Sequence, residues 1–221
     1  MYAPDEMRKF FVNHRVRYNE FMKDLYTAQA PAVSHKRSNP VDRRGAARGT
    51  DGGVRPGTGD QLASALSVLG VNFLLGGTHE KESLHEQPAR LIAELAKSNE
   101  ARLRLALIPL FLKYPEFAAH VRKTATSLNK TACTTLQCYY SAAVCLQQKY
   151  RSRLKVLIGE KQSLPDHFSR ELGLEITSDP EVQLQALAER HQLLSGARLN
   201  WLGTYEHAMQ VWLKGLQIQN V

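Results

Sequence analysis

Apolar residues recur every three to four positions along most of this 221-residue chain, which is the spacing of one face of an α-helix. The densest stretch runs from Ala101 to Gly159, and residues 131–158 give its longest uninterrupted pattern. We predict one long central helix there. Its continuous apolar stripe is made of Leu136, Tyr139, Ala143, Leu146, Tyr150, Leu154 and Leu157. A second stripe of small residues (Cys138, Ala142 and Cys145) favours close approach of a neighbouring helix.

The same period predicts shorter helices on both sides of the central one. They cover residues 61–69, 88–97, 101–112, 116–128, 164–173, 180–195 and 197–215. Pro109 should kink the helix 101–112, because proline lacks an amide hydrogen. Strand patterns are nearly absent from the sequence. We therefore expect an all-α fold, an irregular multi-helix bundle of about seven helices around the central one, in which the passage 88–112 resembles a single HEAT-like helical hairpin.

The first 59 residues differ from the rest in composition. Residues 5–29 carry an apolar stripe that includes Phe10, Phe11 and Phe21, which predicts an amphipathic helix. Residues 30–59 hold no aromatic residue and are dominated by Gly, Pro, Ser and Arg. Such a segment cannot bury enough apolar area to offset the entropy of ordering it. The predicted parts are an N-terminal helix at 1–29, a disordered, flexible basic linker at 30–59 and a helical bundle domain at 60–221.

Charge and apolar content limit the classes of protein to which the chain can belong. Residues 1–58 hold eleven Lys/Arg against six Asp/Glu, so most of the net charge of +8 lies in the first quarter. The longest near-apolar run is interrupted by Arg104 and Pro109, whereas a membrane span needs about 20 apolar residues. The N-terminus lacks the apolar segment of a signal peptide. We expect a cytoplasmic protein that does not enter a membrane.

The three cysteines fall within thirteen residues of the predicted central helix. Cys138 and Cys145 are seven positions apart, about 10 Å along a helix, which is too far for a disulfide. Their spacing also differs from that of a zinc site. We interpret them, with Cys133, as small helix residues packed in the core.

Both tryptophans of the protein lie in the predicted C-terminal helix 197–215. One stripe of that helix is aromatic and the next is aliphatic, and together they are wider than one docking face requires. Two outcomes are open: either one stripe packs inward and part of the other contacts a partner, or the bundle buries both. The first predicts a partner-binding site made of Trp201, Tyr205, Glu206, His207 and Trp212.

A basic cluster lies at the end of the predicted central helix and consists of Lys149, Arg151, Arg153 and Lys155. Cations near a helix C-terminus are favourable by a few tenths of a kcal/mol, roughly, which explains the cluster without any ligand. The alternative is contact with nucleic acid by this cluster and the Arg-rich linker. The linker has no aromatic residue between its arginines, so base stacking is missing from that alternative.

The common sequence motifs of enzymes are missing from this chain. The sequence contains no phosphate loop, dinucleotide fingerprint, nucleophile elbow or calcium loop. The group His79, Glu80, Glu82, His85 and Glu86 lacks the spacing of a zinc helix. Glu206 and His207 are adjacent, and consecutive helix residues point about 100° apart, so they do not converge for acid–base catalysis. We expect no catalytic residue, no metal and no cofactor.

Four phrases of the sequence resemble a family of bacterial helical proteins that are often encoded beside a small nucleotidyltransferase. The phrases are ARLRLALIPLFLKYPEFA, LQCYYSAAVCLQQKY, LPDHFSRELGL and LSGARLNWLGTYEHAMQVWLK. The resemblance covers roughly residues 60–215 and implies the non-enzymatic member of a toxin–antitoxin-like pair. The leading hypothesis is therefore a non-catalytic protein-interaction module, the partner or antitoxin of a nucleotidyltransferase, and the alternative is a nucleic-acid-binding helical protein.

Overall fold

The computed structural model describes residues 58–71, 84–175 and 177–219, and these are helices and their connections without a strand. Residues from Thr58 onward form one compact unit. The expected all-α fold is confirmed for this part of the chain. The predicted N-terminal helix, nearly all of the linker and the group from His79 to Glu82 lie outside the described residues. None of the described helices has the length and apolar content needed to cross a membrane.

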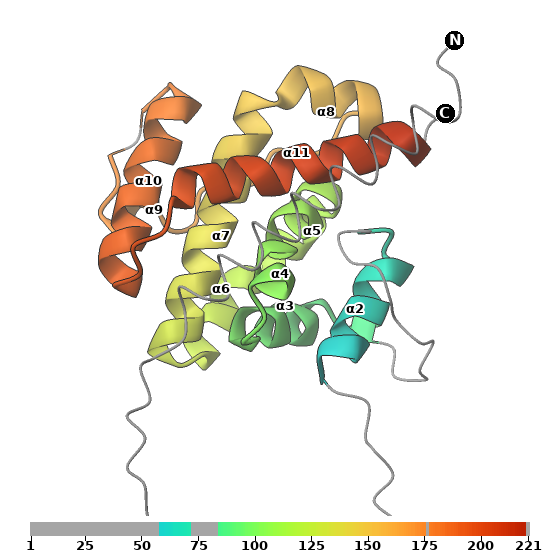
Figure 1. Ribbon diagram of the computed structural model, residues 1–221, viewed down its shortest axis with the longest axis horizontal. Helices are drawn as coiled ribbons and strands as arrows, with labels where there is room; N and C mark the ends of the chain where they lie inside the picture. The colour runs from blue at the N-terminus through green and yellow to red at the C-terminus, as the bar shows by residue number, and fades with distance from the viewer. Residues whose placement is uncertain (1–57, 72–83, 176, 220–221) are drawn as a thin grey trace, which may run out of the picture. The chain divides into compact units, whose positions relative to one another are not determined.

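The central helix of the bundle is α7, Lys130–Lys149, and it is followed directly by α8, Arg151–Ile158. Asn129 caps its start by accepting a hydrogen bond from the Ala132 amide (2.9 Å). Helices α5 and α10 pack closely along α7, and α3, α6 and α11 also contact it (Figure 1). Its small-residue stripe is fully buried, which is what close packing of neighbouring helices requires.

The single helix predicted for 131–158 is wrong at one position, because α7 ends at Lys149 and α8 begins at Arg151. Figure 1 shows the two helices running in different directions, and we call the change of direction the bend. Tyr150 has φ −101° and ψ 16°, outside the helical range. Hydrogen bonds of helical spacing still reach it from both sides, from its own amide to Leu146 O and from the Leu154 amide to its carbonyl (both 2.9 Å). Periodicity alone could not locate this bend, since neither proline nor glycine marks it.

The elements before α7 follow the predicted order and are short. They are α2 Thr58–Val68, η1 Leu84–Glu86, α3 Pro88–Lys97, α4 Ala101–Leu105, α5 Leu107–Lys113, η2 Pro115–Phe117 and α6 Ala118–Ser127. The predicted helix 101–112 is divided at Ala106 rather than merely bent. Pro109 is the cause, because it has no amide hydrogen to donate to Leu105 O four residues earlier.

After α8 the chain forms α9 Ser169–Leu172, α10 Pro180–Ser195 and α11 Trp201–Gln219. The predicted helix 164–173 is wrong in its first half, because the Asp166 carboxylate accepts from the amides of Phe168 and Ser169 and starts the helix later. The start of α10 is confirmed, with Asp179 as its cap (2.8 Å to the Glu181 amide). Its end is confirmed at Gly196, whose φ of +67° favours glycine. Helix α11 is shifted by four residues from the predicted 197–215.

The cysteines behave as predicted. All three are free thiols; Cys138 and Cys145 are buried, and Cys133 is half-buried. Burial raises the pKa of both Cys138 and Cys145 to about 12, so these thiols stay protonated and unreactive at neutral pH.

Candidate functional site

The aromatic residues predicted to contact a partner belong to the core. Trp201, Tyr205 and Trp212 are 5%, 0% and 3% exposed. The neighbouring aliphatic stripe is buried too, apart from half-buried Leu202. Helix α11 contacts α5, α7, α8 and α10, so the bundle covers it on more than one side. The expectation of a stripe left open for a partner is therefore corrected, and the alternative of two buried stripes describes the structure.

A buried aromatic cluster joins α7, α10 and α11, and His191 lies at its centre. The His191 ring stacks on Trp201 with centroids 3.6 Å apart and meets Tyr139 edge-on at 5.7 Å. A hydrogen bond of 2.6 Å joins its Nδ1 to the Tyr205 hydroxyl. Burial, together with the charge of Arg104, lowers the pKa of His191 to about 3. The imidazole is therefore neutral at pH 7 and holds three helices together.

Glu206 belongs to the predicted partner-binding site and Lys149 to the predicted basic cluster, and the structure pairs the two residues. Lys149 Nζ lies 2.7 Å from Glu206 and 2.9 Å from Glu181. The Tyr150 hydroxyl donates to the other Glu206 oxygen at 2.5 Å and accepts from Gln210 at 2.9 Å. The hydrogen bond to Glu206 is the main cause of the raised pKa of Lys149. We call this the bend network, because it ties the bend between α7 and α8 to α11 and α10.

The bend network engages both oxygens of Glu206, one with Lys149 and the other with Tyr150. His207, the next residue, is half-buried, and burial followed by the charge of Lys214 lowers its pKa. Sequence reasoning identified these residues but could not find their contacts, because the bonds from Lys149 and Tyr150 to Glu206 span 57 and 56 positions of the chain.

The predicted basic cluster is divided by the structure. Lys149 belongs to the bend network, and its charge is neutralised there. Arg153 makes a long hydrogen bond of 3.4 Å to Gln217, and Lys155 forms an exposed ion pair of 3.0 Å with Glu160. Arg151 is exposed at the start of α8. Arg151 and Lys155 line a small cavity, while Lys149 and Arg153 do not.

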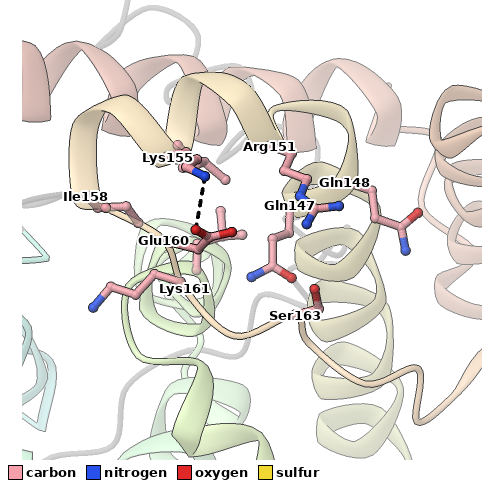
Figure 2. A pocket seen from close by; sticks show the side chains of 11 residues that line it. Gln147, Gln148, Arg151, Lys155, Ile158, Glu160, Lys161 and Ser163 are labelled. Atoms are coloured by element: carbon pink, nitrogen blue, oxygen red, sulfur yellow. Dashed lines mark hydrogen bonds and ion pairs between the residues drawn. The ribbon is translucent and has the colours of Figure 1, made fainter.

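This cavity lies between α8, the end of α7 and the connection 159–163, and its volume is about 80 Å³. We call it the bend cavity. Figure 2 shows the Arg151 side chain directed toward Gln147 and Ser163, while Lys161 points away from them. Its charged lining consists of three cations and one carboxylate: Arg151, Lys155, Lys161 and Glu160. The remaining lining residues are Leu112, Gln147, Gln148, Leu154, Ile158, Gly159 and Ser163.

Gln147 fixes the far wall of the bend cavity. Its amide nitrogen donates to Gln162 O (3.0 Å), and its amide oxygen accepts from the Leu164 backbone (2.7 Å). The connection after α8 is thereby held against α7. Sequence reasoning missed Gln147, Lys161 and Ser163, because they lie outside the apolar stripes and in a connection without a recognisable motif. The one available signal was Gly159, which marks where α8 ends (φ +75°).

In the part of the chain that the structure describes, no group of three or more His, Cys, Asp or Glu side chains could hold a metal ion. Compared with protein-family models, with curated proteins and with solved structures, the chain gives no match.

Proposed function

We propose that this protein is a non-catalytic protein-interaction module, the partner or antitoxin of a nucleotidyltransferase, and that it binds through the outer face of α10. One observation carries the proposal: α10 presents large apolar side chains on both of its faces. Leu184 and Leu187 are fully buried against the bundle. Val182 and Leu193, on the outer side, are 54% and 75% exposed.

The two outer residues are eleven positions apart, which is close to three full helical turns, so they share one face. Leu194 is 42% exposed and points about 100° away from Leu193, so it lies at the border of this face. Figure 1 places α10 at the edge of the bundle, next to α7 and α11. A helix with apolar side chains on both faces gains stability when the second face is covered as well. The site called the α10 face below consists of Val182, Leu193 and Leu194.

The chemistry of the described residues also supports a binding role over a catalytic one. Glu206 is held by Lys149 and Tyr150, and His191 is a neutral core residue with its hydrogen bond made to Tyr205. These groups would have to leave structural contacts before they could act on a substrate.

Co-expression with a small bacterial nucleotidyltransferase, followed by size-exclusion chromatography with light scattering, tests the proposal. We expect a stable complex with the wild type and its loss with Leu193→Asp. Val68→Asp is the matched control, because Val68 is an exposed apolar residue on α2 (51% exposed). A wild-type chain that stays free, or a complex that Leu193→Asp leaves intact, would refute this surface.

Nucleic-acid binding is the second candidate, and the exposed Arg151 favours it. The cluster contributes less charge than the sequence suggested, because Lys149 and Lys155 already face carboxylates. A protein that neutralises few phosphates shows a shallow dependence of affinity on salt. Binding that falls steeply between about 50 and 200 mM salt would favour this candidate, and we expect no such binding.

A further inference from the structure

We propose that the bend cavity is a binding site for the phosphate group of a small phosphate monoester. The inference is independent of the α10 face. Arg151, Lys155 and Lys161 contribute three positive charges to the lining, and Glu160 contributes one negative charge. The net charge of +2 complements a dianion, and a phosphate monoester is close to a dianion at pH 7 because its second pKa is about 6.

The arrangement of donors fits the same group. Arg151 has no ion-pair partner among the described residues, and its guanidinium offers a planar set of N–H donors suited to phosphate oxygens. Ser163 supplies a hydroxyl on the opposite wall, and Figure 2 shows Arg151 directed toward it. Lys155 is divided between the cavity and Glu160, so an entering anion would compete for an exposed pair that is worth little in water.

Size limits what can enter. A cavity of about 80 Å³ has room for several water-sized groups, but pockets that enclose a drug-sized ligand measure roughly 300–1,000 Å³. One tetrahedral anion fits this description, with the rest of the ligand outside in solvent. The described lining holds no aromatic ring, so no base would stack there, which argues against single-stranded nucleic acid.

The walls are set before any ligand arrives. Gln147 holds the connection 159–163 through two hydrogen bonds, and the bend network fixes the direction of α8 through Tyr150. A backbone wall that is already in place need not be ordered when an anion binds, which lowers the entropy cost of binding.

Titration of the full chain with ribose 5-phosphate, monitored by amide chemical shifts in NMR, tests the site at constant ionic strength. Inorganic phosphate tests the group alone, and acetate is the monoanion control. We expect saturable shifts for residues 147–163 with both phosphates and none with acetate. Arg151→Gln should weaken binding at least about tenfold, while Lys123→Gln, an exposed lysine on α6, should not.

Two results would overturn the proposal. One is shifts that do not saturate, or that acetate reproduces, which would mean nonspecific ion binding only. The other is an unchanged affinity in Arg151→Gln, provided that its amide spectrum shows the native fold. An oligonucleotide that binds equally well with and without a 5′-phosphate, and displaces ribose 5-phosphate, would also contradict it, because the site would then recognise a nucleic-acid backbone.

Discussion

The buried His191 makes the stability of this protein depend on pH. Its pKa is about 3 in the fold, against an ordinary value of 6.5. The folded pKa is the lower of the two, so between these values the unfolded chain binds a proton that the folded chain excludes. The stabilisation is therefore complete above about pH 6.5 and is lost as the pH falls toward 3.

The magnitude follows from linkage between protonation and folding. Between pH 7 and pH 5 the unfolded imidazole goes from mostly neutral to almost fully charged, while the folded one stays neutral. The resulting loss of unfolding free energy is about 2 kcal/mol. That is a large share of the roughly 5–15 kcal/mol by which a typical domain is stable.

Urea unfolding followed by circular dichroism at pH 7 and pH 5 measures this loss, and His191→Asn isolates the contribution of His191. The asparagine amide has both a donor and an acceptor for the Tyr205 hydroxyl but does not titrate. The variant will be less stable at both pH values, because it loses the stacking on Trp201. The unfolding free energy of the variant should change less between pH 7 and pH 5 than that of the wild type, by about 2 kcal/mol.

The matched control is His120→Asn, because His120 is exposed on α6. In this variant the unfolding free energy should differ between pH 7 and pH 5 by nearly the same amount as in the wild type. An His191→Asn variant with the same pH dependence as the wild type would refute the reasoning, since it would mean that the imidazole is protonated, or exposed to water, in the folded protein.

Three further predictions concern an ion pair, a helix cap and a glycine with positive φ, and each is measured as the change in unfolding free energy at pH 7. A double-mutant cycle of Lys149→Met and Glu206→Gln should give a coupling of about 1 kcal/mol, because both side chains are about a quarter exposed and partly screened by water; a coupling near zero would exclude the ion pair. Asp179→Ala should cost about 1 kcal/mol through loss of the α10 cap, and Asp179→Asn, which retains an acceptor, should cost less. Gly196→Ala should cost about 1 kcal/mol because its φ is +67°, whereas Gly215→Ala inside α11, with open space around it, should be neutral or stabilising.

Much of the fold could be predicted from the sequence, because its helices are amphipathic and their boundaries carry local signals. The start of α10 at Asp179 and Pro180 and its end at Gly196 need only the residues beside them. The bend at Tyr150 could not be predicted in this way. It is accompanied by hydrogen bonds to Glu206 and Gln210, which lie more than fifty positions away.

The candidate sites were harder to predict, for a related reason. Trp201 and Trp212 are residues of a type that is common in binding surfaces. Their burial depends on how many neighbouring helices cover α11, and α5, α7, α8 and α10 all contact it. Leu193 showed the opposite case. In the sequence it follows the apolar residues Leu184 and Leu187 of the same helix. Only the packing of α10 on α7 shows that its side chain is exposed to solvent. The bend cavity has no pattern in the sequence, because its walls come from α7, α8 and a connection held by Gln147.

Hydrogen exchange of the protein with and without the proposed nucleotidyltransferase partner tests the central claim most directly. If the α10 face is the binding surface, amides of residues 182–194 should exchange more slowly in the complex. Amides around Trp201, Tyr205 and Trp212 should change little, because those side chains are buried already in the free chain. Slower exchange in α11 without any change in α10 would contradict the account and return the aromatic stripe to the interface.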